Sequence, residues 1–512
     1  MTSTGASDLR PIWLLLATFL VAVSSLIYEL IAATLSSYLL GDSIRQFSFV
    51  IGVFLSAMGL GVWLSRFVGS AVLGFVWVQI AIGLIGGALA PTLFFAYAYL
   101  GDIAFLLYGL LGMIGLLSGM EIPLIARVLK DIGAASFRFE NVLSVDYVGA
   151  LVASLAFPIL IIPHFSLTSA SIIFGCLNLG VAGGSIWVFR DKLPVKIWLG
   201  WGGAFALSLV ALVNSERMVS VVDAAMFEDD IIINETTAYQ NIVVTRFRDR
   251  TRLFLNHSIQ FDTLDEHRYH ESLVHPAMAS TPRRAKVLIL GGGDGMAARE
   301  VLKYPDVESI TLVDLDPRIT DLFRTHSDLT ALNSGSLLDP RVTVLADDAW
   351  LYAEATPNVF DVIIVDLPDP KSVTLSKLYS LEFYAILLER LSPHGAMVTQ
   401  AGSPMFARDA YWSVVETLEA TRNPAAPDPL SVTPYHTYVP SFGDWGFVIA
   451  RPLALAQKEV SFPPDLEYMQ PDTWESSQVF ARDVDRTDVE ANSIRSHPLV
   501  AYYQQGWDVW FR

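Results

Sequence analysis

The stretch KVLILGGGDGMAAREVL, residues 286–302, decides the fold of the second half of the chain. It begins with a short apolar run, 286–290, which is typical of a buried strand. A glycine-rich turn over 291–295 follows, and the pattern of 296–303 favours a helix. Glycines in such a turn allow a tight bend and let a ligand approach the start of the helix. The stretch therefore predicts a strand, a ligand-binding turn and a helix.

Strands and helices alternate beyond this stretch. Further strands are expected over 310–314, 342–345 and 360–365, with a helix over 317–325. This alternation predicts a parallel, doubly wound α/β sheet, which binds its ligands at the carboxyl ends of the strands. Four acidic positions follow the predicted strands and should meet at that edge: Asp294, Asp314, the pair Asp347 and Asp348, and Asp366.

The acidic residue in the glycine turn narrows the choice of ligand. Met296 stands where a dinucleotide-binding turn would have its third glycine, and Asp294 would repel a pyrophosphate. Asp314 lies 20 residues beyond Asp294, which suits an acid that binds ribose hydroxyls. The sequence therefore predicts an adenosine with a cationic tail, such as S-adenosylmethionine or its decarboxylated form. The alternative is a glycine turn surrounded by solvated acids, with no ligand.

Charge and hydropathy divide the chain in two. Of its 512 residues 53% are hydrophobic and 17% charged, and the net charge is −18. Residues 1–213 hold nine basic and nine acidic residues, so the net negative charge lies wholly in 214–512. An acidic domain argues against a nucleic-acid partner, which needs a basic face. The aromatic content excludes a disordered chain, and the single cysteine, Cys176, excludes an intrachain disulfide.

Seven apolar runs occupy the first half. A bilayer core about 30 Å thick needs about 20 apolar residues per helix, and each run is near that length. The runs cover 12–34, 47–65, 70–98, 103–126, 143–163, 166–189 and 196–213. We therefore predict a multi-span α-helical domain whose partner is a lipid bilayer, located in the cell membrane and, in a bacterium, the inner membrane. The first run continues well past the core of a signal peptide, which disfavours cleavage.

Basic residues in the short loops predict the topology. With a cytoplasmic amino terminus, eight Lys and Arg residues flank the spans on the cytoplasmic side and two, Arg45 and Arg217, on the other. This bias places the acidic half outside the cytoplasm, provided that the number of spans is odd. Three acids lie in or near spans: Glu29, Glu121 and Asp146. They indicate either a polar pathway for a cation or hydrogen bonds between helices.

The sequence predicts five regions. They are a transmembrane domain over 1–213, a connector over 214–230, a small β-sheet with a helix over 231–280, a Rossmann-like domain of the methyltransferase type over 281–460, and a tail over 461–512. The small sheet should contain strands over 231–234, 240–247 and 251–256, followed by a helix over 265–279. The tail ends in an aromatic cluster over 502–511, which would pack on the α/β domain or meet the membrane interface.

Several short motifs occur in a fixed order between residues 232 and 450. They are Tyr239-Gln240-Asn241-Ile242, Gln260 before Asp265–Glu271, the glycine turn before Arg299-Glu300-Val301-Leu302, Asp347-Asp348, Phe360–Pro370, Leu378-Tyr379 with Phe383-Tyr384, and Gln400 after a strand. As an ordered set they resemble the spermidine synthases, the polyamine aminopropyltransferases. The multi-span half and the segment 435–447 look like the membrane-embedded branch of that family.

The resemblance implies an activity and a role for each matched position. The protein would transfer the aminopropyl group of decarboxylated S-adenosylmethionine, a co-substrate, to an amine such as putrescine, with no resident cofactor or metal. The co-substrate would be held by Gln240, Gly291, Gly293, Asp294, Asp314, Asp347 and Asp348, with Asp294 on the aminopropyl ammonium. Asp366 would be the catalytic base. The acceptor amine would be oriented by Tyr269, His270, Asp369, Gln400 and Tyr438. The resemblance also implies a homo-oligomer, a dimer or larger.

The chemistry agrees with these roles. The attacking amine must be neutral, a carboxylate can take its proton, and the departing thioether needs no acid. An acidic domain also concentrates cationic substrates. Each of these residues also has a purely structural alternative to its functional role. Asp366 and Asp369 would form a turn with a helix cap, Tyr269 would be a packing aromatic, and His270 would lie at the surface.

Departures from the family pattern occur near the expected adenine, at Asp348, and on the amine side of the site. Asp348 replaces a glycine, Met296 a small residue, and Leu367-Pro368 two small hydroxyl residues. The usual Gly-Pro after Pro370 is also missing. These changes leave open which amine is the acceptor. Two other functions compete with aminopropyl transfer, a methyltransferase that uses intact S-adenosylmethionine and a polyamine transporter or sensor with a synthase-like domain.

Overall fold

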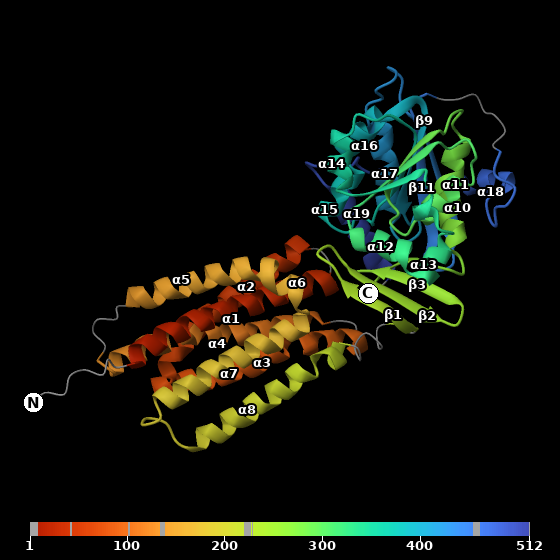
Figure 1. Ribbon diagram of the computed structural model, residues 1–512. Coiled ribbons are helices and arrows are strands. Elements are labelled where there is room, and N and C mark those ends of the chain that lie inside the picture. The colour runs from red at the N-terminus through yellow and green to blue at the C-terminus, as the bar shows by residue number, and fades with distance from the viewer. Residues whose placement is uncertain are drawn as a thin grey trace, which may run out of the picture. The chain divides into compact units, whose positions relative to one another are not determined.

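The computed structural model (Figure 1) describes residues 9–40, 43–100, 103–133, 139–219, 227, 229–453 and 461–510. The chain folds into two compact units, Met1–Asp229 and Asp230–Arg512. The first unit is helical, and the second joins a small antiparallel sheet to a larger α/β fold. Part of the predicted connector, 214–230, lies outside the described residues, as do 454–460 at the end of the predicted Rossmann-like domain.

The first unit is built of long apolar helices. They are α1 (Leu9–Leu40), α2 (Ser43–Leu64), α3 (Ala71–Leu100), α4 (Ala104–Asp131), α5 (Phe139–Ala156), α7 (Leu167–Val188) and α8 (Lys196–Val213). After α5 the chain continues through a π-helical turn, Phe157–Ile161, into the short α6 (Ile162–His164). The described residues contain seven helical segments long and apolar enough to cross a membrane, the number that the sequence predicts.

Small residues let these helices approach closely. A methyl group on Gly119 of α4 would overlap the backbone of Met58 on α2, and one on Gly175 of α7 would overlap the carbonyl oxygen of Gly83 on α3. The side chain of Glu121 is buried in the same unit, where Gln79 donates a hydrogen bond of 2.6 Å to its Oε1. The sequence allows either a polar pathway for a cation or a hydrogen bond between helices at Glu121. The structure contains the hydrogen bond, which joins α3 to α4.

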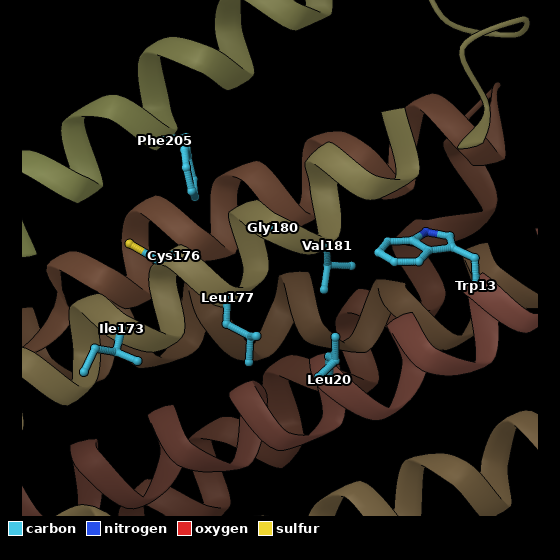
Figure 2. Close-up of a pocket in the computed structure, with 8 residues that line it drawn as sticks. All are labelled: Trp13, Leu20, Ile173, Cys176, Leu177, Gly180, Val181 and Phe205. Atoms are coloured by element: carbon cyan, nitrogen blue, oxygen red, sulfur yellow. The ribbon is translucent and has the colours of Figure 1, made fainter. Parts of the chain in front are cut away.

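An open pocket of about 480 Å³ lies between helices of the first unit (Figure 2). It is lined by Trp13 and Leu20 from α1, by Ile173, Cys176, Leu177, Gly180 and Val181 from α7, and by Phe205 from α8. Figure 2 shows these side chains around the space between the three helices. Its lining is almost wholly apolar, so it offers neither the carboxylates nor the hydrogen-bond groups that polar chemistry needs.

The second unit begins with an antiparallel sheet of four strands in the order β1 (Asp230–Thr236), β2 (Asn241–Phe247), β3 (Arg250–Leu255) and β4 (Ser258–Asp262). The sequence predicts only the first three. The turn before β4 contains Asn256 and His257, which both have positive φ angles of 48° and 62°. Two such residues make a tight hairpin turn, but without the glycine that usually signals one in a sequence. The helix α10 (Glu266–Ala279) follows the sheet.

A seven-stranded sheet forms the centre of this unit, in the order β10-β11-β9-β8-β5-β6-β7. Its strands are β5 (Lys286–Gly291), β6 (Ser309–Asp314), β7 (Val342–Ala346), β8 (Phe360–Asp366), β9 (Leu391–Gly402), β10 (Ser431–Val439) and β11 (Gly443–Arg451). The five strands from β9 to β7 are parallel, as predicted. The hairpin β10–β11 extends the sheet antiparallel to β9, so the whole sheet is mixed.

Helices cover both faces of the large sheet, which explains the unbroken apolar run of β5. The side chains of Val287 and Ile289 belong to one core with α10, α11 (Met296–Leu302) and α12 (Pro317–Thr325). The alternate residues Leu288 and Leu290 belong to another core. That second core includes side chains of α14 (Ala349–Ala355), α16 (Leu381–Glu389), α17 (Arg408–Ala420) and α19 (Pro498–Trp510). The remaining helices of eight or fewer residues are α13 (Ser327–Leu332), α15 (Val373–Ser376) and α18 (Pro471–Ser477).

The tail packs on the α/β domain. Leu499 and Tyr503 of α19 are buried in the core that contains α16 and α17. Of the two alternatives for the aromatic cluster, packing on the α/β domain therefore holds for Tyr503.

Candidate active site

The strand ends of the large sheet are level with one another. Gly291 of β5 pairs with Asp366 of β8, and Asp314 of β6 pairs with Ala346 of β7. The acids that follow these strands therefore gather at one edge of the sheet, as the alternating pattern predicts. One predicted placement is wrong, because Gln400 lies inside β9 and not after it.

The glycine turn closes tightly around this edge. Gly291 and Gly295 have φ angles of 81° and 78°, a region that side-chain-bearing residues rarely adopt. A Cβ atom on Gly291 would overlap the carbonyl oxygen of Asp366, and one on Gly293 would overlap the carboxylate of Asp314. Glycine is therefore required at 291 and 293 for a steric reason.

Asp314 is oriented by the turn that faces it. Its Oδ2 accepts a hydrogen bond of 3.0 Å from the N–H of Gly293, and its Oδ1 accepts one of 2.9 Å from the N–H of Asp316. Burial raises the pKa of Asp314 to about 6, against the lowering effect of these two bonds. Asp347 adjoins it, because its N–H donates to the carbonyl oxygen of Asp314 at 3.1 Å.

The two neighbouring acids after β7 have different positions. Oδ1 of Asp348 accepts hydrogen bonds from the N–H groups of Trp350 and Leu351, at 2.8 Å and 3.2 Å, and so caps helix α14. Oδ1 of Asp347 accepts the N–H of Asp348 at 2.8 Å. Asp348 therefore has a structural task that accounts for an acid in place of glycine.

Gln240 reaches the site from the small sheet. Its Nε2 donates a hydrogen bond of 3.0 Å to Oδ2 of Asp316, and the hydroxyl of Thr237 donates to the same oxygen at 2.8 Å. Asp316 is buried and also caps α12 through the N–H of Arg318. Sequence reasoning missed Asp316, although it stands only two residues beyond Asp314 in the same strand-end position.

Asp294 is held at the start of α11. Its Oδ1 accepts the N–H of Met296 at 2.9 Å, and its carbonyl oxygen accepts a hydrogen bond of 2.8 Å from Nδ2 of Asn333. The hydroxyl of Ser336 donates to the carbonyl oxygen of Gly295 at 2.6 Å. The glycine turn is therefore fixed from outside by the segment that follows α13.

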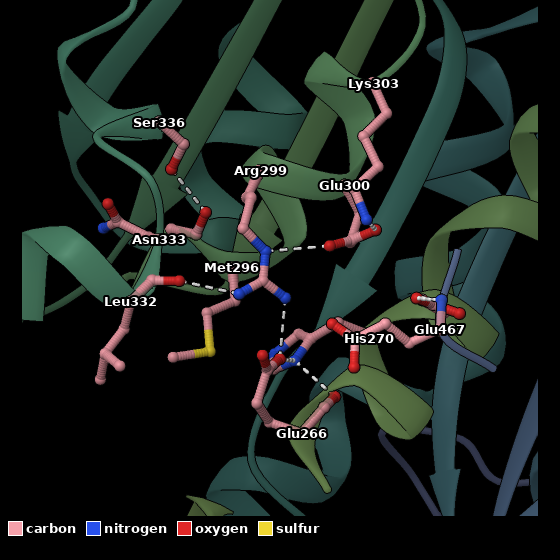
Figure 3. A network of polar contacts seen from close by, with 12 residues as sticks. Glu266, His270, Met296, Arg299, Glu300, Lys303, Leu332, Asn333, Ser336 and Glu467 are labelled. Atoms are coloured by element: carbon pink, nitrogen blue, oxygen red, sulfur yellow. Dashed lines mark hydrogen bonds and ion pairs between the residues drawn. The ribbon is translucent and has the colours of Figure 1, made fainter. Parts of the chain in front are cut away.

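A charged network links α10 to α11 (Figure 3). Oε2 of Glu266 accepts hydrogen bonds from Arg299 Nη2 at 2.9 Å and from His270 Nδ1 at 2.7 Å. Arg299 also donates to Glu300 at 2.9 Å and to the carbonyl oxygen of Leu332 at 2.8 Å. Burial works against ionisation of Glu266, but His270 and Arg299 outweigh it and hold its pKa at about 2. Arg299 thus joins α11, which follows the glycine turn, to α10, the helix that carries Tyr269 and His270.

His270 is buried, which contradicts the alternative of a surface residue. Burial alone would lower its pKa, but the hydrogen bond to Glu266 and the charges of Glu266, Asp294 and Asp366 raise it to about 9. The ring is therefore protonated at neutral pH. A protonated imidazole cannot accept a proton from an amine, so His270 is no general base here.

Tyr269 and Asp366 make direct contact. The hydroxyl of Tyr269 donates a hydrogen bond of 2.6 Å to Oδ1 of Asp366, the last residue of β8. Burial raises the pKa of Asp366 to about 6, although the charge of His270 and the bond from Tyr269 lower it. The ring of Tyr269 packs against Phe442 and Phe447, with centroid distances of 5.6 Å and 5.3 Å. Tyr269 is thus both a packing aromatic and a polar partner of the carboxylate.

Gln400 organises the loop that carries Asp369. Its Nε2 lies 2.7 Å from the carbonyl oxygen of Leu367, 2.6 Å from the hydroxyl of Tyr379 and 3.3 Å from Oδ1 of Asp369. Its Oε1 accepts the N–H of Gly402 at 2.9 Å. Both ends of this buried amide are engaged by the protein, so Gln400 holds the loop in place around Asp369.

Two residues differ from the sequence-based picture of the amine side. Tyr438 lies on β10 with its side chain exposed, and its carbonyl oxygen accepts a hydrogen bond of 3.2 Å from Arg268. In the described part of the chain, no contact joins its side chain to the site carboxylates. Tyr503, which sequence reasoning missed, donates a hydrogen bond of 2.8 Å to Oδ2 of Asp369 from helix α19.

Comparison of the sequence with known proteins shows the family of this chain. The family model for the spermine/spermidine synthase domain matches residues 266–459. The chain is 40% identical over 500 residues to the polyamine aminopropyltransferase of Leptospira interrogans, which covers 97% of this chain and 98% of the relative. It is 42% identical over 505 residues to polyamine aminopropyltransferase 2 of Ralstonia nicotianae, covering 96% of this chain and 98% of the relative.

Among solved structures, the chain is similar to a spermidine synthase in complex with the transition state analogue AdoDATO, with a sequence identity of 25%. It aligns with a TM-score of 0.45 over 50% of this chain and 87% of that one. The likeness to the curated relatives extends over nearly the full length, so it includes the helical unit as well as the α/β unit. The chain therefore belongs to the polyamine aminopropyltransferase family.

Proposed function

We propose that this polyamine aminopropyltransferase transfers the aminopropyl group of decarboxylated S-adenosylmethionine to putrescine and releases spermidine and methylthioadenosine. The observation that carries the proposal is Asp366, a partly buried carboxylate held by Tyr269 beside the glycine turn. Its pKa of about 6 suits a base that is ionised at neutral pH yet basic enough to take a proton.

The nucleoside end of the site supports the co-substrate. Asp314 and Asp347 lie at adjacent strand ends and offer carboxylate oxygens to hydroxyl groups of a ribose. Gln240 would adjoin them through Asp316. A Cβ atom at position 293 would overlap the carboxylate of Asp314, so glycine lets the turn pack directly against this acid.

The cationic end distinguishes the co-substrate from intact S-adenosylmethionine. Asp294 lies at the start of α11, where its charge would attract the ammonium of the aminopropyl group. Intact S-adenosylmethionine carries a carboxylate on the same carbon chain, and that carboxylate would meet an acid. This argument favours aminopropyl transfer over methyl transfer.

The reaction at Asp366 is an in-line displacement. The lone pair of the neutral amine nitrogen attacks the methylene carbon beside the sulfonium, a carbon–nitrogen bond forms, and the carbon–sulfur bond breaks. The bonding electrons return to sulfur, which leaves as a neutral thioether. Asp366 takes the proton lost by the attacking nitrogen and passes it to solvent. Asp294, Asp366 and Asp369 together would balance the charges of two cationic substrates.

Release of methylthioadenosine tests the proposal. The full chain, purified in detergent, is incubated with decarboxylated S-adenosylmethionine and a panel of amines, with intact S-adenosylmethionine as the competing donor. We expect turnover with the decarboxylated donor and the highest kcat/KM with putrescine. Asp366→Asn should abolish turnover while leaving nucleoside binding, measured by calorimetry, within about threefold of wild type. No methylthioadenosine with any amine would refute the proposal.

We also propose that the helical unit spans the bacterial inner membrane and that the protein is a homo-oligomer. Arg10 at the start of α1 and Asp191 after α7 form an ion pair of 3.0 Å, which supports a common side for the two segments. The loop charges favour a position of the α/β unit outside the cytoplasm if the number of spans is odd, whereas a co-substrate made in the cytoplasm favours a position inside. Labelling of a cysteine introduced at Val509, in intact and in permeabilised cells, distinguishes the two sides, and light scattering in detergent gives the oligomeric state.

A further inference from the structure

The tail enters the core of the α/β domain although it lies beyond the family domain. The matched domain ends at residue 459, and α19 begins at Pro498. Leu499 is wholly buried, and Tyr503 is only 7% exposed. Both side chains lie in the core that also contains Leu367 and Tyr379, from the segment between β8 and α16 that carries Asp369. The tail is therefore part of the surroundings of the active site.

Three contacts fix the path of the tail. Asn492 is fully buried, and its Nδ2 donates hydrogen bonds of 2.9 Å and 3.0 Å to the carbonyl oxygens of Ser376 and Tyr379. The backbone of Gly506 lies so close to Ala407 that a Cβ atom at 506 would overlap it. The ring of Trp507 packs on Phe406 at a centroid distance of 5.1 Å. Helix α19 thus has little freedom to shift relative to the segment between β8 and α16, which carries Asp369.

The hydroxyl of Tyr503 completes the coordination of Asp369. It donates to Oδ2 at 2.8 Å, while Gln400 reaches Oδ1 at 3.3 Å, so the carboxylate is held from both sides. Burial raises the pKa of Tyr503 well above its ordinary value, and the charge of Asp369 raises it further. The phenol therefore stays protonated and remains a hydrogen-bond donor over the whole working range of pH.

A diamine has two nitrogens with different needs. The attacking nitrogen must lose its proton to Asp366, whereas the distant one stays protonated and needs a counter-charge. Asp369 lies three residues beyond Asp366 and is the next carboxylate along the loop. Its direction decides how well the distant ammonium is bound.

We propose that Tyr503 is a positioning residue for the acceptor amine, which fixes Asp369 in the orientation that binds the distant ammonium of a diamine. The inference rests on the proposed function, since it assumes that Asp369 faces the acceptor. It assigns to the tail a part in choosing the substrate. Loss of the hydroxyl should affect acceptors with a second ammonium and leave those without one unaffected.

The test compares Tyr503→Phe with wild type on two acceptors of equal chain length. Putrescine has the second ammonium, and n-butylamine, used as a substrate or as a competitor, lacks it. For putrescine we expect KM to rise about tenfold with kcat within about twofold of wild type. For n-butylamine we expect KM or the inhibition constant to stay unchanged. Affinity for methylthioadenosine should also stay unchanged.

Tyr502→Phe is the matched control. Its hydroxyl accepts a long contact of 3.4 Å from the N–H of Glu490, and Tyr502 belongs to the same turn of α19. We expect this variant to match wild type on both amines. An unchanged KM of Tyr503→Phe for putrescine would overturn the inference, and so would an equal rise for both amines, which would indicate a purely structural role. A wild-type protein inactive with every amine would overturn the proposed function instead.

Discussion

Tyr269 and Asp366 stand 97 residues apart in the chain and are joined by a hydrogen bond of 2.6 Å. The bond couples helix α10 to the end of strand β8, so the position of the proposed base depends on a helix outside the large sheet. The same bond lowers the pKa of Asp366, while burial raises it. Several measurable properties depend on this balance.

The first prediction concerns the pH dependence of turnover. We expect kcat of the wild type, at saturating co-substrate, to fall as the pH drops through about 6, because Asp366 must be ionised to accept a proton. In Tyr269→Phe the lowering hydrogen bond is lost, so the pKa of Asp366 rises. The acidic limb should then move to higher pH by about half a unit to one unit. A limb that moves to lower pH contradicts the proposed relationship.

A second prediction concerns the stability that Glu266 provides. Glu266→Gln leaves protonated His270 without its ion-pair partner and Arg299 with Glu300 alone, and should cost about 3 kcal/mol of the free energy of unfolding. Ionised Glu266 stabilises the fold above about pH 4.5, and this contribution disappears as the pH falls through about 2. Protonated His270 stabilises it below about pH 6.5, and that contribution disappears as the pH rises through about 9.

The difference in Tm between wild type and Glu266→Gln should therefore be widest between about pH 4.5 and 6.5 and should narrow as the pH rises through 9. Thermal unfolding across this range measures it. Glu419→Gln is the control, because its ion pair with Arg486 is partly exposed and should contribute no more than about 1 kcal/mol. A pH-independent difference would show that His270 is not protonated in the folded protein.

The third prediction separates the two acids after β7. Asp347→Ala should weaken binding of the co-substrate more than about tenfold, whereas Asp348→Ala should lose the cap of α14 and about 1 kcal/mol of stability. Asp348→Ser should restore most of that stability, since serine also caps helices. Calorimetry and thermal unfolding give the two readouts. If Asp348→Ser weakens nucleoside binding as much as Asp347→Ala, Asp348 is a ligand and not only a cap.

The fourth prediction concerns the glycine turn. Gly293→Ala puts a methyl group into the carboxylate of Asp314, so we expect the affinity for methylthioadenosine to fall more than about tenfold. Gly335→Ala is the control, because a Cβ atom there meets no neighbouring atom although its φ is 70°. That variant should lose some stability and keep its affinity. Equal affinity in Gly293→Ala and wild type would show that the turn can open.

Much of the nucleoside side could be predicted from the sequence, for a physical reason. Parallel strands carry their acids to one edge of the sheet. Asp314 on β6 and Asp366 on β8 therefore lie at the same edge, on either side of β5. The length of the apolar runs likewise predicted the helical unit. The number of strands in the small sheet was underestimated, because the turn at Asn256 and His257 adopts positive φ without glycine.

The amine side could be predicted only in part. Asp369 stands in a local motif, but its two hydrogen-bond partners come from β9 and from α19, and no spacing rule links such distant segments. Gln400 was recognised as a residue of the site, yet its engagement by Tyr379 and Leu367 depends on tertiary packing. The contact of Tyr503 lies in a segment without any recognised motif, so only the fold reveals it.

The hydrogen bond between Asp369 and Tyr503 spans 134 residues of chain. Ribosomes add about 5–20 residues per second, so roughly 7–27 seconds pass between synthesis of the two residues. By then the apolar helices of the first unit have long left the ribosome. The proposed amine site therefore matures only long after the helical unit has been synthesised, and a nascent chain cannot engage diamines fully before Tyr503 is in place.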